Sequence, residues 1–75
     1  MRLISKEEFE SNESMKQYLC GTVNELDNVC HSIKSITTDG YNSKPHKSRL
    51  IRCGSFAAYI SNFRLGIDVF EVWEV

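Results

Sequence analysis

The most regular feature of the sequence is a heptad spacing of apolar residues in its first half. Successive apolar positions lie alternately four and three residues apart, with Thr22 filling one position: Met15, Leu19, Thr22, Leu26, Val29, Ile33 and Ile36. This spacing is typical of an amphipathic α-helix, because residues three and four apart share one helix face. The pattern predicts a helix from about Glu13 to Ser35.

The width of this apolar stripe indicates what the helix packs against. Tyr18, Val23 and Cys30 widen the stripe to one side. A wide stripe is typical of a helix that lies on a sheet, whereas a narrow one is typical of a two-stranded coiled coil. We expect the stripe to form the core face of the domain, and a homodimeric coiled coil is the alternative.

A shorter helix is predicted at the N-terminus. The run SKEE at positions 5–8 is a capping box, in which the Ser5 hydroxyl can accept a hydrogen bond from the backbone N–H three residues on. Ile4 and Phe9 stand at the two positions of a hydrophobic staple. The Ser-Asn pair at 11–12 then interrupts the helix, and either side chain can cap the one that follows.

Residues 49–75 hold the only tryptophan, every phenylalanine except Phe9, and most of the β-branched residues outside the predicted long helix. Their alternation of apolar and polar positions favours a β-hairpin that turns at Ser61-Asn62. A helix over residues 55–65 is the alternative, because four apolar residues there have helical spacing: Phe56, Tyr59, Ile60 and Phe63.

The hairpin register gives the predicted sheet two distinct faces. It places Arg49 opposite Glu74 and Arg52 opposite Glu71, and opposite-charge pairs across strands stabilise a sheet. The more apolar face should pack on the long helix, and it consists of Leu50, Phe56, Leu65, Ile67, Val69 and Trp73. The other face has an apolar centre within a polar ring, and it consists of Arg49, Ile51, Cys53, Tyr59, Arg64, Phe70, Val72 and Glu74.

Length, composition and cysteine content place the chain among small globular proteins. Seventy-five residues suffice for one domain, and a quarter of the residues are charged, as in ordinary soluble proteins. Cys20 and Cys30 would lie about 15 Å apart on the predicted helix, beyond the reach of a disulfide. The sequence begins with no signal-peptide pattern and has no membrane-length apolar run, so we expect a reducing, cytoplasmic location and no membrane.

Charge is unevenly distributed along the chain. The net charge is −1, yet residues 32–66 alone carry +5. Residues 37–48 are predicted to form a loop, because they contain a turn signal at Asp39-Gly40 and the only proline. The segment 41–52 can contact phosphates and stack a base, which makes nucleic-acid binding an alternative function through Tyr41, Lys44, His46, Lys47, Arg49 and Arg52.

The sequence contains no recognisable catalytic, cofactor or metal motif. Cys30 and His31 are adjacent, and neighbouring helical residues point about 100° apart, so they cannot act on each other as nucleophile and base. The cysteines and histidines lack the short ligand spacing of zinc sites, and the four glycines form no phosphate loop. We therefore predict no catalytic residue, cofactor or metal, and a cysteine-dependent enzyme is the remote alternative.

These observations predict an α+β fold in residues 1–75: a short capped helix, a long amphipathic helix and a C-terminal hairpin packed on that helix. A two-stranded sheet leaves two open edges and one open face, which can recruit another chain. We expect a small non-enzymatic protein-binding module, an inhibitor or regulator of a larger protein or a homodimer. The expected contact surface is the polar-ringed face described above, or the sheet edge.

Overall fold

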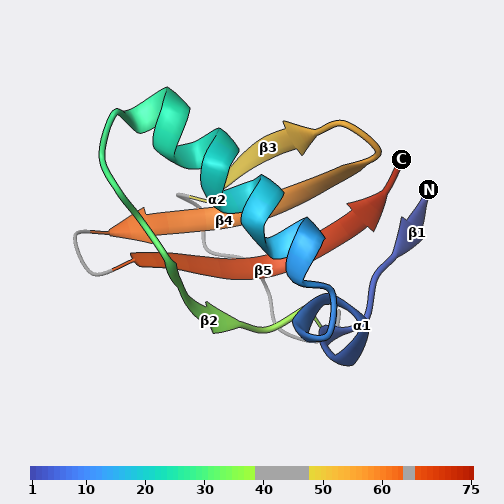
Figure 1. The fold of residues 1–75 in the computed structure, drawn as a ribbon. Coiled ribbons are helices and arrows are strands. Elements are labelled where there is room, and N and C mark those ends of the chain that lie inside the picture. The colour runs from blue at the N-terminus through green and yellow to red at the C-terminus, as the bar shows by residue number, and fades with distance from the viewer. Residues whose placement is uncertain (39–47, 64–65) are drawn as a thin grey trace.

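The computed structural model describes residues 1–38, 48–63 and 66–75 of the chain. The α+β class predicted from the sequence is confirmed, since two helices accompany one sheet (Figure 1). The elements in chain order are β1 (Arg2–Leu3), α1 (Lys6–Glu10), α2 (Glu13–Asp27), β2 (Ile33–Ile36), β3 (Arg49–Cys53), β4 (Phe56–Phe63) and β5 (Gly66–Glu74).

The sheet is mainly antiparallel, with the strand order β1-β5-β4-β3. One edge of β5 pairs with β4 along most of its length. The other edge is shared by β1, which is antiparallel near the end of β5, and β2, which is parallel near its start. Figure 1 shows the two termini side by side, because Arg2 of β1 pairs with Glu74 of β5.

The short N-terminal helix forms as predicted. The Ser5 hydroxyl accepts a hydrogen bond from the Glu8 backbone N–H at 3.2 Å, and both residues of the hydrophobic staple, Ile4 and Phe9, are fully buried. The Asn12 side chain caps α2 by accepting from the Met15 backbone N–H at 3.0 Å. Local capping chemistry therefore places both helix starts correctly.

The predicted end of the long helix is wrong. Helix α2 stops at Asp27 instead of Ser35, and Asn28 follows it with a left-handed φ of 58°. Asparagine is one of the few non-glycine residues that adopt this conformation readily, and it is a common helix terminator. The apolar residues at 33 and 36 belong to β2 instead, where they pair with β5. The predicted heptad stripe is thus divided between a helix and a strand.

The core lies between α2 and one face of the sheet (Figure 1). Leu19 and Val23 are the fully buried residues of α2, and Met15 and Cys20 pack beside them. Leu26 is 63% exposed, although the heptad pattern predicts it in the core. The contact face of α2 is therefore rotated from the predicted one.

The C-terminal region is extended, so the helical alternative for residues 55–65 is wrong at Phe56–Phe63. The predicted turn at Ser61-Asn62 is also wrong, because the chain turns first at Gly54-Ser55, between Cys53 and Phe56. Gly54 has a φ of 62°, and glycine at the first position of a two-residue loop is typical of a type II′ hairpin turn. A second hairpin joins Phe63 to Gly66 and completes a three-stranded meander.

The first turn reverses the predicted faces of β3, whereas Phe56, Ile67 and Val69 lie on the helix side as predicted. It places Cys53 directly opposite Phe56, so Ile51, Cys53 and Phe56 share one side. That side is the buried one, under α2. Leu50, predicted to face the helix, is 49% exposed. The predicted charge pairs are absent from the described ladder, in which Arg49 lies opposite Ile60 and Arg52 opposite Ala57.

Candidate binding surface on the outer sheet face

The face of the sheet that points away from α2 is here called the outer face. Two rows of side chains cross it, because side chains alternate along each strand and align between strands. The first row is Arg52, Ala57 and Trp73, and the second row is Leu50, Tyr59 and Glu71. Three adjacent strands thus present one aromatic-rich strip.

The outer face is hollowed by a groove of about 310 Å³. Its lining consists of Met1, Leu50, Arg52, Ala57, Tyr59, Glu71, Trp73 and Val75. Ala57 lies in the register between Arg52 and Trp73, and it is only 5% exposed. A methyl group between two long side chains leaves a trough above it, so Ala57 forms the floor of the groove.

Apolar walls and the Arg52 guanidinium give the groove its chemical character. The Trp73 indole Nε1–H donates to a Glu71 carboxylate oxygen at 2.9 Å, which orients the ring and engages that carboxylate. Arg52 is exposed, and no described residue forms an ion pair or side-chain hydrogen bond with it. The groove therefore suits a ligand with an apolar group and a carboxylate.

The groove extends to an open edge of the sheet. Strand β3 ends the strand order, and within residues 1–38, 48–63 and 66–75 only β4 pairs with it. The outward edge of a terminal strand carries backbone N–H and C=O groups available to another chain. Leu50 and Arg52 belong both to this strand and to the lining of the groove.

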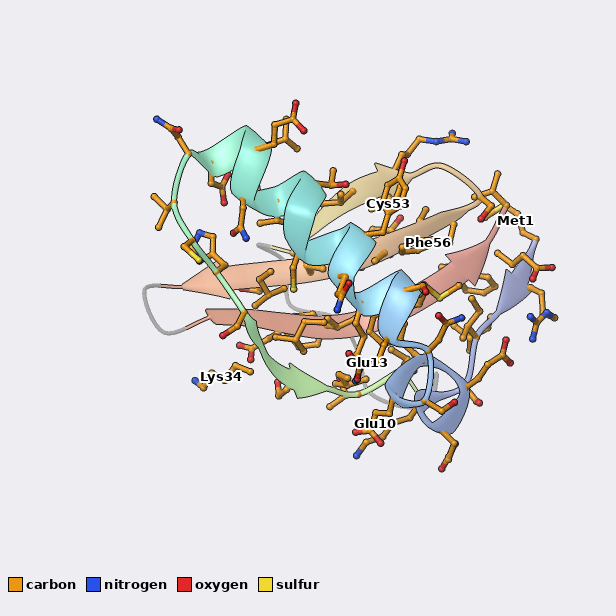
Figure 2. The ribbon with its side chains drawn as sticks, in the orientation of Figure 1. Met1, Glu10, Glu13, Lys34, Cys53 and Phe56 are labelled. Carbon is orange, nitrogen blue, oxygen red and sulfur yellow. The ribbon has the colours of Figure 1, made fainter. Side chains whose placement is uncertain are left out.

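The structure does not bring the predicted protein-binding residues onto one surface. Ile51, Cys53 and Val72 are buried in the core, so the predicted exposed face is wrong for these three. Figure 2 shows Cys53 next to Phe56 beside α2. Tyr59 lies on the outer face as part of the groove.

The remaining members of that predicted face are scattered. The Arg49 guanidinium donates to the Asp27 carboxylate of α2 at 2.7 Å. Glu74 pairs with Arg2 at 3.0 Å. Phe70 occupies a β-bulge, because Tyr59 pairs with Glu71 and the next β4 residue pairs with Val69. Arg64 lies outside the described residues.

The residues of the predicted nucleic-acid surface fall mostly outside the described part of the chain. Tyr41, Lys44, His46 and Lys47 belong to residues 39–47, which the structure does not describe. Of the other two, Arg49 is engaged by Asp27 and Arg52 is exposed in the groove. The nucleic-acid alternative stays a prediction.

The cysteines differ in exposure. Burial raises the pKa of the Cys20 and Cys53 thiols above their usual value, which lowers the fraction of reactive thiolate at neutral pH. Cys30 is exposed, and its neighbour His31 directs Nε2 toward an Asp27 carboxylate oxygen at 3.5 Å. Among the described residues, no three His, Cys, Asp or Glu side chains gather as a metal-binding group.

The predicted binding surfaces leave out six residues of the groove: Met1, Leu50, Ala57, Glu71, Trp73 and Val75. The missed signal was Gly54-Ser55, a dipeptide typical of a two-residue hairpin between two apolar runs. With that turn in place, Leu50 and Arg52 share the face of Ala57. Glu71 and Trp73 reach this face only through the β-bulge at Phe70.

Searches of protein-family models, curated proteins and solved structures give no significant match to the chain. Within the described residues, none of the helices combines the length and the apolar character that a membrane crossing requires. The fold and the groove are therefore the basis for the function proposed below.

Proposed function

We propose that the protein is a small non-enzymatic binding module, an inhibitor or regulator that contacts a larger protein through its outer sheet face. The observation that carries this proposal is the groove above Ala57, bounded by Trp73 and Arg52. Tryptophan, tyrosine and arginine are the residues most enriched at the energetic centres of protein interfaces, and this groove contains one of each.

The composition of the groove indicates the chemistry of its occupant. Its walls supply aromatic and aliphatic surface, which an apolar side chain of the partner would cover. The Arg52 guanidinium lies beside that surface without a described partner, and it would receive a carboxylate in a charge-assisted hydrogen bond. The proposed occupant is a peptide segment with an apolar side chain close to an acidic one.

Two substitutions on the outer face test this proposal. Ala57→Leu fills the floor of the groove without entering the core. Arg52→Glu replaces the positive charge in the groove with a negative one. Each should reduce capture of the partner from nuclease-treated host lysate by about tenfold or more, since 1.4 kcal/mol corresponds to a factor of ten. The readout is quantitative mass spectrometry of proteins retained by the immobilised chain.

Matched controls separate loss of the groove from a general effect of the substitution. Lys34→Glu makes the same kind of charge reversal on β2, which lies at the other edge of the sheet from β3. Gly21→Ala adds a methyl group on the exposed side of α2. Both controls should capture the same protein as the wild type. A protein captured equally by all five chains, or no selective capture by any, contradicts the proposed function.

We place this module in the cytoplasm. Its three cysteines are free, which suits a compartment that keeps thiols reduced. Recovery of the chain in the cytoplasmic fraction, with all three thiols open to alkylation after denaturation, supports this location. Recovery from an oxidising compartment contradicts it.

A further inference from the structure

We propose that the outward edge of β3, which no described strand pairs with, receives an extended segment of the partner as an added antiparallel strand, with the residue order acidic, apolar, apolar. This inference rests on the proposed function and specifies the partner's chemistry. It follows from three features of β3: the direction of its backbone groups, its charge and its two flanking surfaces.

The hydrogen-bond phase of the sheet shows which backbone groups face outward. The Val75 N–H donates to the Ser55 carbonyl at 2.9 Å, in continuation of the β4–β5 register. Hydrogen-bonded and non-hydrogen-bonded pairs alternate along an antiparallel ladder, so Ala57 and Tyr59 direct their backbone groups toward β5. Their partners across the other ladder, Arg52 and Leu50, consequently direct theirs away from β4.

The backbone hydrogen bonds described outside the ladders involve neither Leu50 nor Arg52. The N–H and C=O groups of two alternate residues are thus presented at the edge in the spacing that an added strand requires. Ile51 and Cys53 have the opposite phase, because their backbone groups bond to β4.

The charge of β3 favours a different protein over a second copy. Its five residues include Arg49 and Arg52 and no acidic residue. An antiparallel pair of β3 strands centred on Ile51 would bring four arginines into one small area, and like charges close together destabilise a sheet. Asp27 already engages Arg49, whereas Arg52 has no described partner. An acidic residue opposite Arg52 completes the cross-strand pair.

The two flanking surfaces specify the next two residues of the partner. A residue opposite Leu50 lies on the outer face and extends the apolar side of the groove. A residue opposite Ile51 points to the helix side. There Tyr18 and Leu26, 56% and 63% exposed, share a face of α2, and the Tyr18 side chain lies beside Gly54 at the end of β3. Both positions therefore favour apolar side chains.

The order follows from the strand direction. An antiparallel strand passes Arg52 first, then Ile51 and then Leu50, which gives acidic, apolar, apolar from its N-terminus. Antiparallel addition continues the direction of the β5-β4-β3 meander, and antiparallel pairs are the more stable per residue.

A proline substitution distinguishes strand addition from side-chain contact. Leu50→Pro removes an outward N–H while keeping the β4 ladder, and proline is tolerated on edge strands in that phase. Leu50→Ala removes the same side chain and keeps the N–H. The probe is a phage library of random nine-residue peptides, and the selected peptides are resynthesised for titration. Leu50→Pro should weaken binding by about tenfold or more, and Leu50→Ala by about threefold or less.

The selected sequences test the order and the charge pair. They should be enriched in acidic, apolar, apolar triplets over the reversed order. Exchanging the acidic residue for lysine should weaken binding to the wild type and restore binding to Arg52→Glu. Equal enrichment of both orders, or no rescue by lysine, contradicts the proposed partner.

Amide hydrogen exchange of the wild type supplies a measurement that requires no folded variant. In the free protein the Ile51 amide should exchange slowly and the Leu50 and Arg52 amides fast. The selected peptide should slow those two by about tenfold or more, because a paired amide exchanges only on opening. Unchanged exchange overturns strand addition.

Failure of this inference is distinguishable from failure of the proposed function. If Ala57→Leu abolishes capture of the lysate partner while Leu50→Pro does not, the groove function stands and strand addition is wrong. If the wild type sediments as a dimer that Leu50→Pro dissociates, the occupant is a second copy, which also overturns the inference.

Discussion

Two glycines of the chain occupy opposite environments. Gly21 lies in α2 with nothing within 4 Å of the position a Cβ would take. Gly66 begins β5 with a φ of 138°, and a Cβ there would lie 2.7 Å from the Ser32 carbonyl oxygen. That oxygen accepts a hydrogen bond from the Ile67 N–H at 2.8 Å, so it cannot move aside without disrupting the β2–β5 pairing.

Alanine at these two positions should therefore have opposite effects on stability. Gly21→Ala should raise the free energy of unfolding by about 0.5–1 kcal/mol, because alanine restricts the unfolded chain and favours the helix. Gly66→Ala should lower it by about 3 kcal/mol through backbone strain and the clash with Ser32. Urea denaturation followed by circular dichroism measures both. Equal effects of the two substitutions would contradict the geometry at Gly66.

Capping residues were the part of the fold most readable from sequence, because their chemistry is local. Ser5 and Asn12 each bond a backbone N–H three residues away, and no distant residue is needed to recognise them. The helix end at Asn28 is hard to predict from the sequence for the converse reason. An asparagine inside an apolar repeat is compatible with a helix, and only its left-handed conformation reveals the helix end.

At the scale of elements, helix α2 shows how a regular pattern can belong to two structures. The spacing from Met15 to Ile36 fits one helix, yet its last part pairs with β5 as a parallel strand. Parallel pairing joins residues that are far apart in sequence, so no local rule could predict it. The partner strand decides whether the β-branched Ile33 and Ile36 extend the helix or the sheet.

The rotated contact face of α2 leads to a prediction about two leucines. Leu19→Ala should destabilise the protein by about 2–5 kcal/mol, because Leu19 is fully buried and its loss leaves a cavity. Leu26→Ala should change stability by no more than about 0.5 kcal/mol, because Leu26 is mainly exposed. Thermal and urea denaturation measure the difference. A large loss of stability in Leu26→Ala would support the predicted heptad face as the core face, or the coiled-coil alternative.

The β3–β4 turn determines how much of the candidate site the sequence could predict. Strand content at residues 49–53 and 56–63 was predictable from alternation alone. The side on which the β3 residues lie was not, since moving the turn from Ser61-Asn62 to Gly54-Ser55 exchanges the two faces of that strand. Ile51 consequently moves from the predicted open face into the core, and the β-bulge at Phe70 moves Trp73 from the predicted core to the outer face.

At the scale of the whole molecule, one arginine connects both ends of the chain to the first helix. The Arg2 guanidinium donates to both carboxylate oxygens of Glu8, at 3.0 and 2.9 Å, and to Glu74 at 3.0 Å. Strand β1 is only two residues long, so this network supplements a short ladder. The Met1 and Val75 walls of the groove depend on the same termini.

This network predicts a specific pH dependence of stability. The hydrogen bonds from Arg2 lower the pKa of Glu8 below its usual value of 4.5. A carboxylate with a lowered pKa stabilises the folded state above the unfolded-state pKa, and the contribution is lost as pH falls through the folded-state value. Glu8→Gln should therefore melt at a lower temperature than the wild type at pH 7, and the difference should vanish by about pH 2.

Circular dichroism melts at pH 7, 4 and 2 measure this effect, and Glu10→Gln is the matched control on the same helix. Because Glu8 is exposed, salt should screen the interaction, so the pH 7 difference should shrink in about 1 M sodium chloride. If Glu8→Gln has the same melting temperature as the wild type at pH 7, 4 and 2, the Arg2–Glu8 pair does not stabilise the fold. In that case the chain termini are held by the β1–β5 ladder and the buried Ile4, whose N–H donates to the Val72 carbonyl at 2.7 Å.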